Sequence, residues 1–92
     1  SAAILTRLVV PSAQLLDLHA EVSRLTAPHL RPGPMPHTVP GDWTPHVTLA
    51  RRVLPDQLAR ALAIAGRPAE ISATAAGLRL WNGNARTEIR IF

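Results

Sequence analysis

The sequence contains no cysteine, no lysine and no apolar run that approaches the roughly 20 residues needed to cross a bilayer. Without cysteine the chain forms neither disulfides nor thiolate metal sites, which agrees with a reducing compartment. We therefore expect a cytoplasmic protein without a membrane span. Apolar residues make up 47% of the chain and charged residues 17%, which favours folding over disorder. With 92 residues, the chain allows a single domain with a small core.

All ten basic residues are arginine, spread from Arg7 to Arg90, and the net charge is +4. Guanidinium groups bind phosphates bidentately, so the composition allows an anionic partner such as RNA. Codon bias in a GC-rich genome explains the same arginine content. The charge alone therefore does not establish a nucleic-acid partner.

Hydrophobic periodicity predicts four strands and two helices in the order β-α-β-α-β-β. The strands are expected over residues 2–10, 46–51, 70–81 and 86–92, and Gly77 is a candidate bulge in the third. Ser12 is expected to cap a first helix that stops by Ala27, and a second helix is expected to start at Pro55 and end before Gly66. This order predicts an α+β lobe in which both helices cover one face of a single antiparallel or mixed sheet.

The charges of the last two strands predict the register of their hairpin. A four-residue loop over residues 82–85 sets Arg79 opposite Glu88 and Trp81 opposite Arg86, which gives an ion pair and a cation–π contact. A two-residue Asn-Gly turn instead sets Arg79 opposite Arg86, and like charges directly opposite each other are destabilising. We therefore expect the four-residue loop.

Residues 28–45 carry six of the nine prolines and show no internal periodicity. Long loops in compact domains are often functional, and this one leads directly into His46, so it is a candidate wall of a substrate cleft. Trp43, near its end, has two interpretations: it stacks on a base or sugar, or it covers the apolar surface of the loop itself. Trp81, beside the hairpin turn, is interpreted as structural.

The run from Pro45 to Arg51 places a histidine and a hydroxyl in an otherwise apolar strand. Because strand side chains alternate between faces, His46, Thr48 and Ala50 are expected on one face, and Val47, Leu49 and Arg51 on the other. An imidazole moves a proton near neutral pH, and a hydroxyl donates a hydrogen bond to a phosphate oxygen. The pair therefore suits chemistry at a phosphoryl group.

His-Val-Thr-Leu-Ala-Arg, preceded by Trp43-Thr44-Pro45, resembles the second signature of the 2H phosphoesterases, the superfamily of the bacterial 2′-5′ RNA ligase-like proteins and RNA 2′,3′-cyclic phosphodiesterases. The element order resembles the C-terminal lobe of that two-lobed fold over nearly the whole chain, whereas the motif itself covers residues 43–51. The resemblance implies hydrolysis or reversible ligation of RNA 2′,3′-cyclic or 2′-5′ phosphodiesters without metal or cofactor. Paired His-x-Thr/Ser motifs, one per lobe, supply a general base, a general acid and two phosphate-binding hydroxyls. It implies that His46 is one catalytic histidine and Thr48 one of the hydroxyls.

The sequence departs from this pattern because it holds a single His-x-Thr. His37 is followed directly by Thr38, His19 falls at the edge of the apolar stripe of the first helix, and His29 lies in the proline-rich loop. The spacing of the histidines at 29, 37 and 46 does not suit a metal site. We therefore expect residues 1–92 to be one lobe that needs an N-terminal lobe of the same protein or a second copy. The absence of an initial methionine favours a fragment or a processed chain.

Arg51, Arg52 and Trp43 are the candidate substrate-binding residues. In a regular strand Arg52 shares the face of His46 and Arg51 points away, so Arg52 is the better phosphate ligand, although both also fit solvated charges at a strand end. Two other functions remain open: a non-catalytic lobe that binds RNA or a protein, and an amphipathic dimerisation domain. A dimerisation domain would leave His46 and Thr48 without a shared role, whereas no feature of the sequence excludes the non-catalytic lobe.

Overall fold

The computed structural model describes residues 2–92 and confirms the predicted α+β class and element order. The strands are β1 (Ala3–Leu8), β2 (His46–Val53), β3 (Arg79–Asn82) and β4 (Thr87–Arg90), and the helices are α1 (Ala13–Thr26) and α2 (Leu58–Ala65). Short 3₁₀ turns at Ala27–His29 and Pro55–Gln57 follow α1 and precede α2. Between Leu30 and Pro45 the chain forms neither helix nor strand, which is the proline-rich loop.

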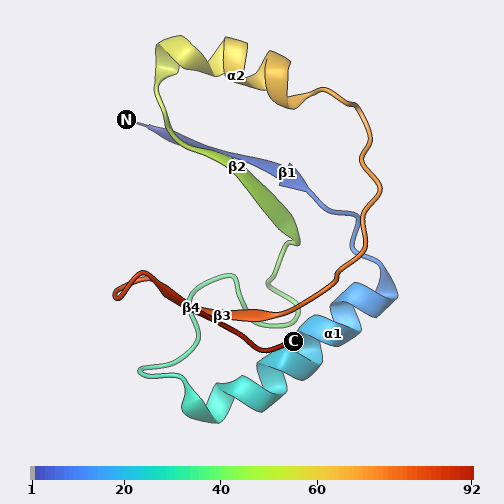
Figure 1. The fold of residues 1–92 in the computed structure, drawn as a ribbon, viewed down its shortest axis with the longest axis vertical. Helices are drawn as coiled ribbons and strands as arrows, with labels where there is room; N and C mark the ends of the chain where they lie inside the picture. Colours follow the sequence, from blue (N-terminus) through green and yellow to red (C-terminus); the bar gives the residue numbers. More distant parts are fainter. Residues whose placement is uncertain (1) are drawn as a thin grey trace.

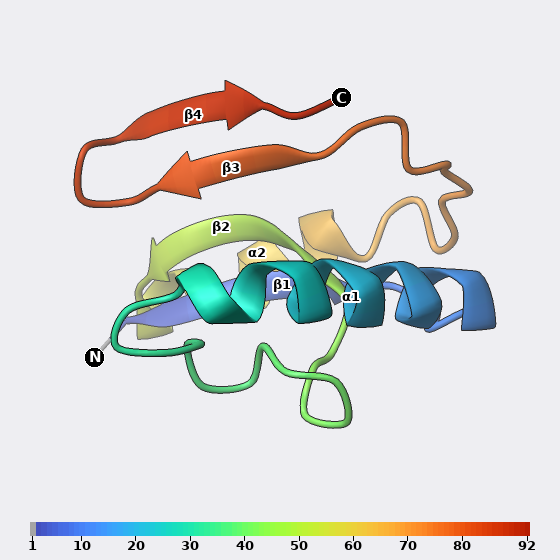
Figure 2. The ribbon, with the colours of Figure 1, turned by 90° about the horizontal axis from the view of Figure 1, so that it is seen from below.

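The strands form two separate antiparallel pairs, β1–β2 and β3–β4, where a single sheet was predicted. Figure 1 shows α2 above the β1–β2 pair and α1 below it, and Figure 2 shows α1 crossing in front of the same pair. The prediction that both helices cover one face is therefore wrong. The two strands of the β3–β4 hairpin hydrogen-bond to each other and not to β2, and Figure 2 shows the hairpin apart from the β1–β2 pair.

The β1–β2 ladder is regular at one end and irregular at the other. Leu8 pairs with His46, Arg7 with Val47 and Thr6 with Thr48 in regular succession. Beyond that point Leu5 pairs with Ala50 and Ala3 with Val53, so β2 carries one extra residue at each of two register shifts. Arg52, within the second shift, has a left-handed φ of 56°. Such bulges bend a strand and re-aim its side chains.

The caps predicted for the helices explain where they begin and end. The hydroxyl of Ser12 accepts a hydrogen bond from the backbone N–H of Leu15 at 3.2 Å, which satisfies one of the free donors at the start of α1. α2 ends before Gly66, as predicted, although its first turn is the 3₁₀ turn that Pro55 opens. The Arg7 side chain of β1 donates to the carbonyls of Ala65 and Pro68, which ties the end of α2 to the sheet.

The hairpin keeps a four-residue loop, but the loop starts one residue later than predicted. Asn82 pairs with Thr87 and Trp81 with Glu88, so the loop covers residues 83–86. The reason is local: the side-chain oxygen of Asn82 accepts from the N–H groups of Asn84 and Ala85, both at 3.1 Å, which starts the turn after Asn82. Arg86 closes the loop with a φ of 52° instead of entering the strand.

This register changes the partners of Arg79. It stands opposite Arg90 on the ladder, where Glu88 was predicted. The predicted ion pair with Glu88 still forms, because the long guanidinium reaches diagonally across the strands. The guanidinium carbon of Arg79 also lies 5.5 Å from the centre of the Trp81 ring, so Arg79 makes the cation–π contact expected of Arg86.

Residues 70–78 are not a strand, in contrast to the prediction. A strand needs a neighbour with which its backbone forms hydrogen bonds. In this segment only Leu78 has backbone hydrogen bonds of that kind, with Ile91 and Phe92, the two residues that follow β4. Gly77 marks a close approach and not a bulge, because a Cβ there would stand 2.6 Å from the carbonyl oxygen of Phe92.

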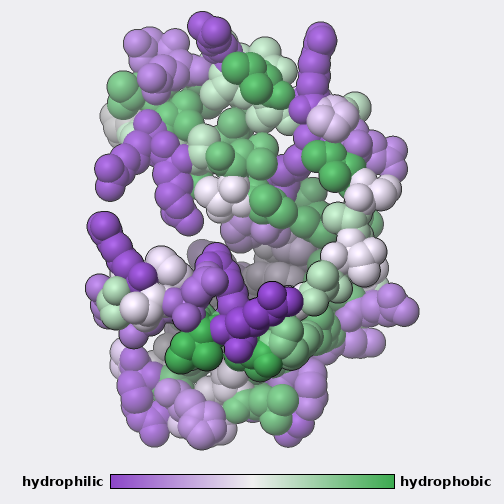
Figure 3. All heavy atoms as spheres, viewed as in Figure 1, coloured by the Kyte–Doolittle hydropathy of each residue, from purple (hydrophilic) through white to green (hydrophobic). Residues whose placement is uncertain are grey.

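Much of the apolar surface is open to solvent. Within residues 2–92, Val53 is the only large apolar side chain that is buried, and Val47 and Leu49 on β2 remain 54% and 45% exposed. The radius of gyration is 15.5 Å, whereas a compact domain of about 100 residues has roughly 13 Å. Figure 3 shows exposed apolar side chains on both the upper and the lower part of the molecule in this view, and a hollow between the two parts.

Candidate functional site

His46 is the first residue of β2, and its exposed ring is held by its own backbone. Its Nδ1 lies 2.7 Å from the carbonyl oxygen of Thr44, two residues before it. A carbonyl oxygen only accepts, so Nδ1 carries the proton of this bond. The other ring nitrogen, Nε2, is therefore the one available for proton exchange with a ligand.

Thr48 lies on the same face of β2 as His46, because the ladder is regular over residues 46–48. Its side chain is half-buried and stands opposite Thr6 of β1. One face of this strand end therefore presents an imidazole and a hydroxyl, with a second hydroxyl across the ladder. The sequence did not single out Thr6, because cross-strand neighbours follow only from the register.

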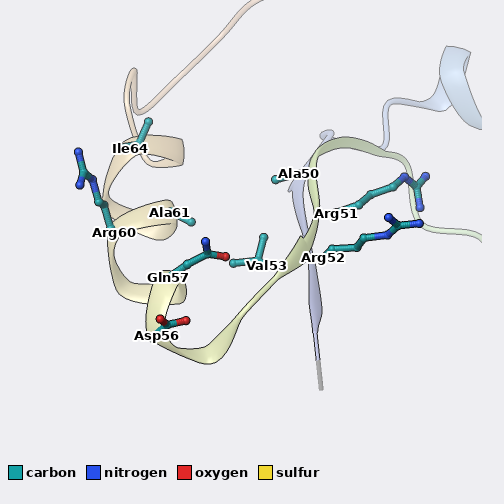
Figure 4. Close-up of a pocket in the computed structure, with 9 residues that line it drawn as sticks. All are labelled: Ala50, Arg51, Arg52, Val53, Asp56, Gln57, Arg60, Ala61 and Ile64. Atoms are coloured by element: carbon teal, nitrogen blue, oxygen red, sulfur yellow. The ribbon is translucent and has the colours of Figure 1, made fainter.

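Arg51 and Arg52 lie at the opposite, bulged end of β2. Figure 4 shows both side chains extending to the same side of the strand, away from α2. The strict alternation that placed them on opposite faces fails here because the left-handed backbone at Arg52 interrupts the pleat. A hollow of about 540 Å³ lies between this end of β2 and α2 (Figure 4). Its lining residues are Ala50, Arg51, Arg52, Val53, Asp56, Gln57, Arg60, Ala61 and Ile64.

Trp43 stacks on His19 of α1, with ring centroids 3.7 Å apart and planes within 3° of parallel. The contact joins the end of the proline-rich loop to the helix, so one face of the indole is covered by the protein itself. A smaller hollow of about 160 Å³ lies between the loop and α1, and His19 is part of its lining. His19 therefore has a packing role, and its partner could not be foreseen from residues 24 positions apart in the sequence.

The other two histidines, His29 and His37, belong to segments outside β2. His37 pairs with Asp42 inside the loop, with 3.3 Å between Nδ1 and the carboxylate oxygen, and His29 lies in the turn after α1. Over residues 2–92, no group of three or more His, Cys, Asp or Glu side chains is placed to hold a metal ion. The same residues include no helix with both the length and the apolar character of a membrane span.

The structure thus brings together some of the predicted site residues and separates others. His46 and Thr48 share a face, and the Thr44 carbonyl joins them as the partner of the imidazole. Arg51 and Arg52 line the larger hollow, of which neither His46 nor Thr48 is part. Trp43 stacks on His19 of α1.

One comparison with known proteins identifies the family of this chain. The family model of the 2′-5′ RNA ligase superfamily matches residues 1–87, which is nearly the whole chain. Neither the curated proteins nor the solved structures provide a match. Because the family model spans β1 through the start of β4, it covers the element order as well as the His46 strand. The chain therefore belongs to the 2′-5′ RNA ligase superfamily, a group of phosphoesterases and ligases.

Proposed function

We propose that this chain supplies one of the two His-x-Thr half-sites of a metal-independent phosphodiesterase that acts on RNA 2′,3′-cyclic or 2′-5′ phosphodiesters. In-line hydrolysis forms a bond from water to phosphorus and breaks the bond to a ribose oxygen. It needs a base to take the proton of the water and an acid to protonate the leaving oxygen. His46 performs one of these proton transfers and a second imidazole the other.

The observation that carries the proposal is the hydrogen bond between His46 Nδ1 and the carbonyl of Thr44 at 2.7 Å. It fixes the ring and leaves Nε2 at the exposed strand end, where a phosphodiester has access. Thr48 follows on the same face, so its hydroxyl is placed to donate to a phosphoryl oxygen as negative charge builds there. Membership of the superfamily supports the same pairing of roles.

The second half-site comes from outside these residues, because the sequence holds one His-x-Thr motif. The exposed apolar side chains of β1 and β2 support a covering partner, since such surface favours association. We propose an N-terminal lobe of the same protein as that partner, and a two-fold copy of this chain as the second choice. Arg51 and Arg52 then contribute positive charge to the RNA backbone.

A non-catalytic RNA-binding lobe is the second candidate function. One observation favours it: Arg51 and Arg52 extend to the same side of β2 (Figure 4), at the end of the strand away from His46 and Thr48. Such a lobe binds phosphates without turnover, so its affinity falls steeply with salt while no product forms.

The test is hydrolysis of a 2′,3′-cyclic nucleotide, with the molar mass followed by light scattering over the same range of protein concentration. We expect little activity from the monomer. Turnover per chain should rise with concentration if two copies form the cleft, or appear when a lobe with its own His-x-Thr is added. His46→Ala should remain inactive in both arrangements.

Concentration-independent turnover by a monomer would refute the two-half account. Salt-sensitive RNA binding without turnover in either arrangement would replace it with the binding function. His29→Ala is the matched control, because this histidine lies in the turn after α1 and outside the motif.

A further inference from the structure

The contact between His19 and Trp43 joins two parts of the chain that the proposed reaction does not otherwise use. The rings stack at 3.7 Å between centroids and 3° between planes. Both residues are half-buried, and His19 lies in the middle of α1 whereas Trp43 ends the proline-rich loop. A flat pair of this kind fixes both the distance and the tilt of the indole relative to the helix.

Two residues, Thr44 and Pro45, separate Trp43 from His46, the first residue of β2. Pro45 is buried, and its carbonyl accepts a hydrogen bond from the N–H of Val9 at 3.0 Å. The carbonyl of Thr44, between Trp43 and Pro45, is the partner of His46 Nδ1. The segment 43–45 is therefore fixed at its first residue by α1 and at its last residue by the chain that follows β1.

We infer that the His19–Trp43 stack positions His46 by holding the Thr44 carbonyl toward Nδ1, which keeps Nε2 free of the ring proton and ready for proton transfer. The tautomer of a neutral imidazole follows the hydrogen bond that its other nitrogen makes. The Thr44 carbonyl makes that bond here, and its direction depends on the backbone on either side of it. His19 and Trp43 are then positioning residues, which act through His46. Their effect on turnover rests on the reaction proposed above.

A simpler cause has to be separated from this one. Pro45 already restricts Thr44 to extended backbone, because the proline ring clashes with a helical residue before it. Pro45 and the start of β2 are the alternative cause, which would aim the carbonyl without the stack. The two causes differ in what happens when the ring of residue 19 is removed and Pro45 is kept.

The experiment is ¹⁵N–¹H NMR of the histidine side chains in the complete chain, at a pH where the imidazoles are neutral. In the wild type we expect the His46 proton on Nδ1. In His19→Ala we expect that signal to be lost and the two tautomers to mix. His19→Phe restores a flat ring and should restore the Nδ1–H signal. His29→Ala and Trp81→Leu are matched controls that should keep the signal, because His29 lies in the turn after α1 and Trp81 lies in β3, outside the stack and the segment 43–45.

A wild-type proton on Nε2 would overturn the inference, because the Thr44 carbonyl would then not hold Nδ1–H. An unchanged Nδ1–H signal in His19→Ala would overturn it in favour of Pro45 alone. Backbone amide spectra report whether β1 and β2 remain paired in each variant. If His19→Ala loses that pairing, His19→Leu is the second variant, because it keeps the bulk of the side chain without the ring. An intact Nδ1–H signal in His19→Leu would also overturn the inference.

The result is independent of the proposed function, because the tautomer is read without substrate. In an active assembly the same His19→Ala change should lower kcat about tenfold with little change in KM, since a misplaced catalytic group costs rate more than binding. A changed tautomer without any hydrolysis in the wild type would leave the positioning inference standing and remove the proposed reaction.

Discussion

The two ends of β2 are built differently, although one strand carries both. At the His46 end the ladder runs without interruption, the ring is tied to the Thr44 carbonyl and Thr48 stands opposite Thr6. At the other end the ladder shifts register twice, and Arg52 adopts a left-handed φ of 56°.

In the function proposed above, the two ends of β2 serve different purposes. Groups that act on one phosphorus atom have to keep a fixed separation, which an uninterrupted pleat provides. Arginines that bind a polyanion need to point the same way, and neighbouring residues of a regular strand do not. The bulge turns Arg51 and Arg52 to one side of β2, as Figure 4 shows.

The largest expected effect is at the regular end. In an active assembly, His46→Ala should lower kcat by about 10²- to 10⁴-fold, because it removes positioned proton transfer in the transition state. KM should change little, since the remaining phosphate contacts act in both states. Steady-state kinetics on a 2′,3′-cyclic nucleotide measure both, with His29→Ala as the control. A near wild-type kcat would show that the regular end of β2 does not carry the chemistry.

A smaller loss is expected at Thr48. Thr48→Val keeps the shape and removes the hydroxyl, which should cost about 10- to 100-fold in kcat/KM, the usual worth of a hydrogen bond to a charged group. Thr48→Ser keeps the hydroxyl and should retain most of the activity. Equal losses in the two variants would assign Thr48 to packing.

The bulged end should respond through stability. Arg52→Val places a branched side chain at a left-handed φ and should lower the free energy of unfolding by about 1–2 kcal/mol, whereas Arg52→Gly should not. Arg51→Val, one residue earlier, is the matched control and should change stability little. Urea titrations compare the three variants. Similar values at both positions would mean that β2 is regular throughout.

The smallest effect is expected away from β2, at the exposed pair of Glu21 and Arg24 on α1. Their side chains lie 2.5 Å apart, and the hydrogen bond from Arg24 lowers the pKa of Glu21 and raises that of Arg24. A lowered carboxyl pKa adds stability above the ordinary pKa of Glu21, and that stability is lost as the pH falls through the lowered value.

The difference in urea midpoint between wild type and Glu21→Gln should therefore be small near neutral pH and disappear in acid. This pair shows how much a solvent-exposed ion pair contributes to the stability of the same molecule. A difference in urea midpoint that grows as the pH falls would contradict the predicted direction of the pH dependence.

Short-range rules in the sequence predicted several features correctly. The Ser12 cap, the end of α2 before Gly66 and the strand at His46 all depend on neighbours within a few residues. The shared face of His46 and Thr48 follows from alternation, which holds where the ladder is regular. Superfamily membership also followed from the motif and the element order.

Features that depend on distant partners were missed. Residues 70–78 look like a strand because they are apolar, but they find no adjacent strand with which to pair. The hairpin register turned on the side chain of Asn82, which binds the loop N–H groups and moves the turn by one residue. The bulge at Arg52 and the stack between His19 and Trp43 leave no mark in local periodicity.

The solvent-exposed apolar side chains of this chain make its free energy of unfolding depend on the concentration of any partner that covers them. Any partner that binds the folded lobe and not the unfolded chain adds RT ln(1 + [L]/Kd) to the free energy of unfolding. The melting temperature should then rise with protein concentration or with added partner, and a value measured in dilute solution describes the lobe only at that dilution. Within residues 2–92, Val53 is the one large apolar side chain that is buried, which provides little core, so this linkage sets how much folded chain is present for any reaction.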